Sequence, residues 1–114
     1  MADLLPDWYD EWILLERERV RQVRLRALEQ LCERRAAAGC YAGAIEAGMA
    51  AVSADPLRES AHRALIRTHL SEGNVGEAIR QYELCRTLLS AIGVRPTRQT
   101  DALMGPLVAQ SVPA

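Results

Sequence analysis

The chain has 114 residues, of which 49% are hydrophobic and 25% are charged. Both values are ordinary for one globular domain with a single core, and they exclude an intrinsically disordered chain. The formal net charge is −1, so the chain lacks the basic surplus with which a protein neutralises nucleic-acid phosphates.

The composition of the apolar residues favours helices. There are two Trp, three Tyr and no Phe, whereas Ala, Leu and Val are frequent. Small and unbranched side chains suit helix-on-helix packing better than a β-sandwich. No stretch approaches the ~20 consecutive apolar residues of a membrane span, and residues 8–11 interrupt any apolar run of a signal peptide. We therefore expect an all-α protein located in the cytoplasm.

Helical periodicity begins near the N-terminus and is interrupted by a glycine. Asp7 is placed to cap a helix over residues 7–38, and Gly39 to end that helix in a left-handed conformation. A second helix is predicted over residues 41–53. Glu46 is its only charged residue, and a helix that is apolar nearly all round must be enclosed. The sequence therefore predicts that this second helix lies at the centre of the fold.

Three further helices are predicted in the second half. Asp55 is placed to cap a third helix with Pro56 at its first position, where the missing N–H costs nothing. This helix continues to residue 72, and a fourth covers residues 75–91. A short fifth helix starts at Thr97 and is predicted to stop at Gly105-Pro106. The residues predicted to face inward from the third and fourth helices are Leu57, Ala61, Leu65 and Thr68, and Ala78, Tyr82, Cys85, Leu89 and Ile92.

Two segments of the chain resemble each other. Gly, Ala and Ile coincide when residues 39–45 are aligned with residues 73–79. This offset matches the ~34-residue period of tetratricopeptide repeats, each of which is a helix–turn–helix. The alternative is a chance coincidence of Gly and Ala. The predicted fold is therefore tetratricopeptide-like: two repeats of antiparallel helical hairpins, with capping by the flanking segments 8–20 and 97–108.

The sequence offers no set of residues for catalysis or metal binding. His62 and His69 are two helical turns apart, ~10 Å, which is too far to chelate one metal ion together. They are interpreted as surface or helix-contact histidines. Cys32, Cys40 and Cys85 have no C-x-x-C spacing and are expected to be buried, reduced thiols. We predict no catalytic, cofactor-binding or metal-binding residue, and a protein that is not an enzyme.

Five residues of the first helix are candidates for an interaction surface. Arg17, Arg21 and Arg24 share one side of the helix. This side is either a solvated face, a docking strip for a neighbouring domain or partner, or a phosphate contact. Trp8 and Trp12 form an aromatic pair that either caps the core or anchors an exposed interface.

Three stretches together resemble the bacterial transcriptional activator domain of the Streptomyces antibiotic regulatory proteins and related actinobacterial regulators. They are Leu5-Pro6-Asp7-Trp8-Tyr9-Asp10-Glu11-Trp12 with Glu16-Arg17-Glu18-Arg19; Asp55-Pro56-Leu57-Arg58-Glu59-Ser60-Ala61-His62-Arg63; and Ala78-Ile79-Arg80-Gln81-Tyr82 with Leu88-Leu89 and Gly93-Val94-Arg95-Pro96-Thr97. The resemblance implies one tetratricopeptide-like domain over residues 4–108, with tails at 1–3 and 109–114.

The resemblance also implies a function. In this family the domain follows an N-terminal winged-helix DNA-binding domain and supports activation through dimerisation or contacts with transcription partners. The present chain has no strand pattern for a winged helix, so we expect it to contact protein, and to reach DNA only through the parent regulator. Neither cofactor nor membrane is expected. The alternatives are a general peptide-binding adaptor and a small-molecule sensor with a cavity between its helices.

Overall fold

The computed structural model describes residues 4–111, and these residues form helices and turns without any β-strand. The all-α prediction is confirmed. The expected bounds of the second and fourth helices agree with the observed ones to within one residue at each end. The helices are α1 (Tyr9–Ala37), α2 (Tyr41–Ala54), α3 (Glu59–Glu72), α4 (Val75–Ser90) and α5 (Arg98–Ser111).

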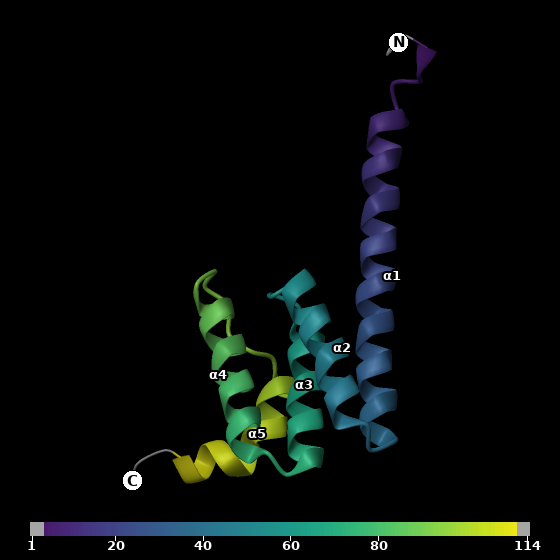
Figure 1. The fold of residues 1–114 in the computed structure, drawn as a ribbon. Helices are drawn as coiled ribbons and strands as arrows, with labels where there is room; N and C mark the ends of the chain where they lie inside the picture. Colours follow the sequence, from purple (N-terminus) through teal and green to yellow (C-terminus); the bar gives the residue numbers. More distant parts are fainter. Residues whose placement is uncertain (1–3, 112–114) are drawn as a thin grey trace.

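The repeat corresponds to two antiparallel hairpins, α1 with α2 and α3 with α4 (Figure 1). Gly39 and Gly73 end the first helix of each hairpin with φ values of +79° and +88°, a left-handed conformation that L side chains rarely adopt. The N–H of Cys40 then donates to the carbonyl of Arg35 at 2.8 Å, and Asn74 makes the equivalent bond. The tetratricopeptide-like arrangement is thus confirmed at both turns.

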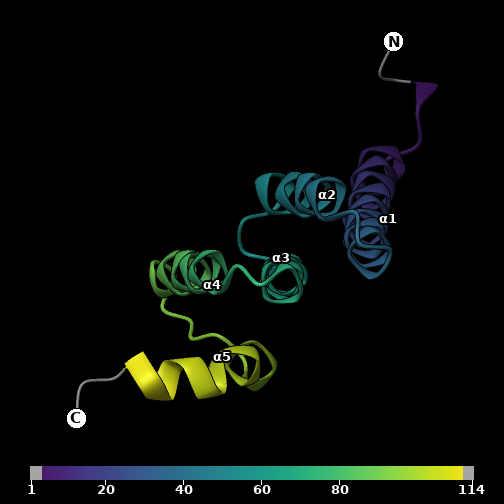
Figure 2. The same cartoon turned by 60° about the horizontal axis from the view of Figure 1, so that its bottom comes forward.

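The central helix is α3, so the prediction that the second helix lies at the centre is wrong. α3 packs against each of the four other helices, and half of its residues are buried. α2 contacts only α1 and α3 (Figure 2), which leaves one of its sides in water. On that side Met49 is 48% exposed and Ala42 and Ala50 are exposed. Alanine at these positions favours the helix without being buried, because its helix propensity needs no tertiary contact.

The core is built mainly of small and aliphatic side chains. The prediction of inward-facing residues is wrong at two positions. Leu57 and Ile92 lie outside the helices and are about half exposed. The buried apolar residues are Leu25 and Cys32 of α1; Ala44, Ala47, Ala51 and Val52 of α2; Ala61, Ala64, Leu65 and Ile66 of α3; Ala78, Tyr82, Cys85 and Leu89 of α4; and Met104 of α5.

The two predicted N-terminal caps are also wrong. α1 begins at Tyr9, and no side chain caps it, because Asp7 lies within the preceding turn. α3 begins only at Glu59. Asp55 instead ends α2, and its Oδ1 accepts a hydrogen bond from the N–H of Leu57 at 3.2 Å. This local hydrogen bond stabilises the turn between α2 and α3, and α3 starts only after that turn.

The fifth helix does not stop at Gly105-Pro106 as predicted. α5 continues to Ser111, and its ribbon bends sharply part-way along (Figure 2). A proline inside a helix removes one hydrogen bond and kinks the axis without necessarily ending the helix. Before the bend, Thr100 and Met104 are fully buried against the rest of the domain, so α5 caps the open end of the second hairpin as predicted.

One carboxylate joins α5 to α3. Glu59 Oε2 accepts hydrogen bonds from the N–H of Thr97 at 2.9 Å, from its hydroxyl at 3.0 Å and from the hydroxyl of Thr100 at 2.6 Å. Burial alone would raise the pKa of Glu59, but these hydrogen bonds outweigh it and hold the pKa below the ordinary value of 4.5.

We expect Glu59→Gln to lower the free energy of unfolding by about 1–2 kcal/mol at neutral pH. A carboxylate whose pKa is lowered by folding stabilises the protein fully above its unfolded pKa, and the stabilisation is lost as the pH falls through the lower folded pKa. The difference between wild type and variant, measured by urea unfolding, should therefore shrink on acidification below the ordinary value of 4.5. A difference that does not vary with pH would contradict this role.

Candidate interaction surface on α1

The first half of α1 projects beyond the rest of the domain. α1 has 29 residues, whereas α2 and α3 have 14 each, which corresponds to lengths of about 43 Å and 21 Å. Figure 1 shows the consequence, since no other helix lies beside the N-terminal turns of α1. Hydrogen bonds from α1 to other elements begin only at Arg21 and Gln22. The prediction that residues 8–20 cap the core is therefore wrong.

The aromatic pair lies in this projecting segment, which we define as residues 4–20. Trp8 and Trp12 are 59% and 47% exposed, and their rings meet edge to face with centroids 6.5 Å apart. Their expected role in capping the core is therefore wrong, and the alternative, that they anchor an exposed interface, stays a prediction. Monomeric proteins rarely leave so many large apolar side chains together in water, and such patches mark contact surfaces. The other exposed apolar residues of the segment are Leu4, Leu5, Leu14, Leu15 and Val20.

Of the three candidate arginines, Arg21 has a structural role. Its Nη1 donates to Asp55 Oδ2 at 3.0 Å, which ties α1 to the end of α2, and its Nη2 donates to Glu18 Oε1 at 2.9 Å. Side-chain hydrogen bonds from Arg21 and then from Gln22 lower the pKa of Glu18 to about 2, and the hydrogen bonds to Glu18 and then to Asp55 raise the pKa of Arg21. These groups are exposed, so each pair adds little stability. Arg21 thus forms ion pairs within the domain, and its place in a docking strip stays a prediction.

Arg17 and Arg24 lie on the exposed side of α1. Among the described residues, neither takes part in an ion pair. Arg17 borders a shallow hollow of about 300 Å³ whose other lining residues are Ile13, Glu16 and Val20. The structure therefore places Arg17 next to apolar side chains of the same helix.

This apolar side of α1, which we call the outer face, was missed by the sequence analysis. It consists of Ile13, Val20, Val23 and Ala27, and Val20 and Val23 are 55% and 57% exposed. Their separations of seven, three and four positions are those of a coiled-coil seam, and this spacing was the sequence signal that pointed to the face. It was overlooked because α1 also carries apolar residues on the side that packs on the core.

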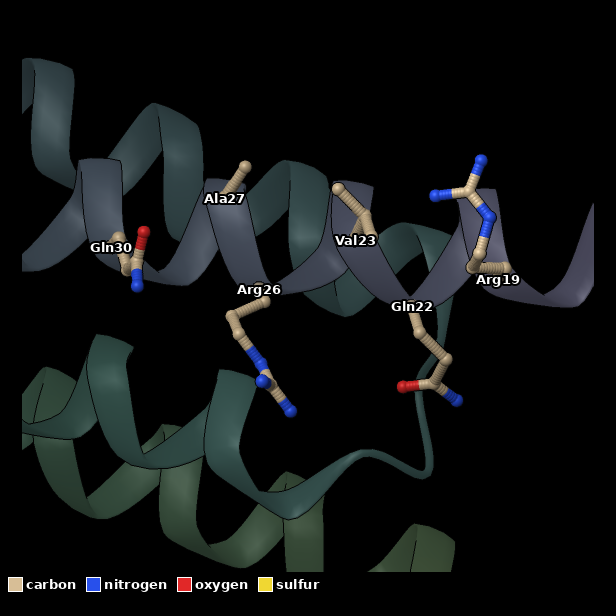
Figure 3. Close-up of a pocket in the computed structure, with 6 residues that line it drawn as sticks. All are labelled: Arg19, Gln22, Val23, Arg26, Ala27 and Gln30. Atoms are coloured by element: carbon tan, nitrogen blue, oxygen red, sulfur yellow. The ribbon is translucent and has the colours of Figure 1, made fainter.

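A second hollow adjoins the outer face. It has a volume of about 460 Å³ and is lined by residues of α1 alone. In Figure 3, Gln22 and Arg26 lie on the side of the helix that turns toward α3, whereas Val23 and Ala27 point the other way. A hollow bounded by one helix is an open groove, in contrast to the enclosed cavity that a small-molecule sensor needs. Its six lining residues are Arg19, Gln22, Val23, Arg26, Ala27 and Gln30.

A polar cluster fixes the C-terminal half of α1 against α3. Arg58 donates from Nε to Glu29 and from Nη1 to Gln22 Oε1 at 2.8 Å, and the Ser60 hydroxyl donates to Glu29 at 2.7 Å. The side chains of Arg58 and Glu29 are only 18% and 12% exposed. Because these bonds set the rotation of α1 about its axis, they also determine that the outer face points away from the domain.

The two histidines contact neighbouring elements, which agrees with their interpretation as helix-contact histidines. His62 is fully buried; Gln81 donates to its Nδ1 at 2.9 Å, and its Nε2 donates to the carbonyl of Pro56 at 2.7 Å. His69 is also buried, and its Nδ1 has no partner among the described residues. Over the same residues there is no group of three His, Cys, Asp or Glu side chains that could hold a metal ion.

The cysteines are free thiols, and two of them are buried as predicted. Burial raises the pKa of Cys85 to about 11, and it also raises the pKa of Cys32, whose sulfur lies 3.4 Å from the hydroxyl of Thr68. Both thiols are therefore kept protonated and unreactive. Cys40 is exposed at the start of α2, so the expectation that all three are buried is wrong there.

The model of the bacterial transcriptional activator domain matches residues 2–107. The chain belongs to this family. The family is a regulatory one and is not known as catalytic. No curated protein and no solved structure matches the chain. Over its described residues, this activator domain has no helix both long and apolar enough to cross a bilayer.

Proposed function

We propose that this bacterial transcriptional activator domain is a non-catalytic protein-interaction module of a DNA-binding regulator in the cytoplasm. In this proposal it follows an N-terminal winged-helix domain, as in the Streptomyces antibiotic regulatory proteins of actinobacteria, and it binds protein rather than DNA. The observation that carries the proposal is the projecting segment, where Trp8, Trp12 and Leu15 are exposed and no other helix covers them.

Three properties of the surface support a protein partner. The projecting segment is close to the N-terminus of the domain, where a preceding DNA-binding domain would be attached. Trp side chains are enriched among the residues that dominate binding energy at protein interfaces. The net charge of −1 gives the domain no general attraction for phosphates.

The alternatives receive less support. A small-molecule sensor would use a cavity between the helices, whereas the two hollows described above are open and each is lined by α1 alone. A general peptide adaptor would bind its peptide in a concave groove of the helical stack. The family assignment favours a regulator over an adaptor unrelated to transcription.

The test changes the chromosomal gene and measures transcripts across the genome, so no target promoter has to be chosen in advance. Genes that depend on the regulator are first defined by deleting it. In a strain with Trp8→Ser and Trp12→Ser, we expect the transcripts of these genes to fall about tenfold, which corresponds to a loss of ~1.4 kcal/mol of docking free energy.

The matched control is Leu84→Ser, because Leu84 is 45% exposed on α4, far from the projecting segment. Both variants should melt at the wild-type temperature, since each replaces an exposed side chain. Equal transcript levels in the Trp variant and in the control would overturn the assignment of the projecting segment as the docking site.

A further inference from the structure

We propose that the outer face of α1 binds an amphipathic α-helix of a partner protein whose apolar stripe is flanked by acidic residues. This inference rests on the proposed function, since it specifies a partner for the interaction module. It concerns Ile13, Val20, Val23 and Ala27, a set of residues separate from the tryptophans at the tip of the helix.

The outer face has the geometry of a coiled-coil seam. Its apolar residues extend over about 21 Å of a straight helix, the length of two heptads. Val20 and Val23 are more than half exposed, although both are large aliphatic side chains. Glu16 interrupts the seam and is held by Arg19, whose Nε donates to it at 3.0 Å. A helix is the element that buries such a seam, by inserting side chains between the knobs of the first helix.

Positive charge lies on both sides of the seam. In heptad positions, Arg17 and Arg24 flank it on one side, and Arg19 and Arg26 flank it on the other. Arg17, Arg24 and Arg26 form no ion pair within the described part of the chain. Four arginines beside one apolar stripe are complementary to a helix with Glu or Asp at its own flanking positions, because these positions set partner choice in paired helices.

The same charges argue against a second copy of this chain as the occupant. In a parallel pair, Arg19 of one copy would face Arg24 of the other. In an antiparallel pair, Arg17 would face Arg24, and Arg19 would face Arg26. Each arrangement therefore opposes arginine to arginine on both sides of the seam, and like charges at these positions oppose association.

The second half of the outer face, with Val23 and Ala27, is rigidly presented. The hydrogen bonds of Arg58 to Glu29 and to Gln22 hold the C-terminal half of α1 against α3. The contact of Arg21 with Asp55 fixes the next turn to the end of α2. A partner helix would therefore find this half of the seam already fixed in position, which lowers the entropic cost of binding.

The experiment uses the full chain and two designed helical peptides of about three heptads. Both have Leu and Ile along the apolar stripe; one has Glu at all flanking positions and the other has Lys. Like charges keep each peptide from pairing with itself. Binding is measured by fluorescence anisotropy at low and at physiological salt. We expect the Glu peptide to bind at least tenfold more tightly than the Lys peptide, and the preference to decrease with added salt.

Two variants test the two arguments separately. Val20→Ser with Val23→Ser should weaken binding of the Glu peptide about tenfold or more, because the apolar stripe is lost. Arg17→Glu with Arg24→Glu should remove the preference for the Glu peptide. Arg80→Glu is the matched control, because Arg80 is exposed on α4, and it should bind like the wild type.

The outcomes separate this inference from the proposed function. Equal affinity for the two peptides, or a Glu-peptide affinity that the valine substitutions leave unchanged, would overturn the acidic-helix partner. A dimer in sedimentation that the valine substitutions dissociate would make a second copy the occupant and would also overturn it. The Trp8→Ser and Trp12→Ser chain should bind the Glu peptide normally, so a failure of the transcript test and a failure of the peptide test can be distinguished.

Discussion

Replacing Gly48 by leucine should lower the free energy of unfolding by about 3 kcal/mol, at the upper end of the cost of overpacking a core. Gly48 lies where α2 crosses α3. A Cβ atom built on it would be only 2.5 Å from Leu65 Cδ2 and 2.7 Å from Leu65 Cγ, and it would also be 3.2 Å from the sulfur of Cys32. These neighbours are themselves fully buried, so they have little room to move. The helices must therefore separate.

The measurement is the thermal melting midpoint, which should fall by more than about 10 °C for a domain of this size. Gly76→Leu is the matched control, because a Cβ at Gly76 in α4 meets nothing within 4 Å. This control should melt at or slightly above the wild-type temperature, since glycine is a poor helix former. Equal midpoints for the two variants would contradict the close approach of α2 and α3.

Arg58→Ala should be the second strongly destabilising change, by about 2–4 kcal/mol. The substitution removes the cation that pairs with Glu29 and leaves a largely buried carboxylate with only the Ser60 hydroxyl as a partner. The larger part of the cost is the charge left without its counterion, whereas the intact pair contributes little by itself. Urea unfolding at neutral pH measures the effect, and the slope of the transition should remain unchanged.

Two companion variants make this prediction specific. Arg67→Ala removes an ion pair with Glu33 that joins the same two helices, but both side chains are about half exposed, so the expected loss is at most about 0.5 kcal/mol. Changing Glu29 and Arg58 together to leucine should recover much of the stability that Arg58→Ala loses, because no unpaired charge remains. A double variant that is less stable than Arg58→Ala would contradict the explanation.

Burial at helix interfaces was predictable on helices that have only one apolar face, because that face has to pack on the core. Ala61, Leu65 and Thr68 of α3, and Tyr82 of α4, are buried as their helical spacing indicates. The spacing fails outside the helices, as at Leu57, because a residue in a turn has no helix face. The candidate site was predictable only in part. Trp8 and Trp12 were singled out, but whether they are covered depends on the lengths of other helices.

The sequence by itself determined the number of helices and the turns between the paired helices, because these depend on local properties. Gly39 and Gly73 adopt left-handed conformations that other residues avoid, and helical periodicity is a property of one segment at a time. The tertiary structure alone decided that α3 is central and that the first half of α1 projects. Two partner helices of 14 residues cannot cover a helix of 29, so equally apolar positions along α1 are buried in one half and exposed in the other.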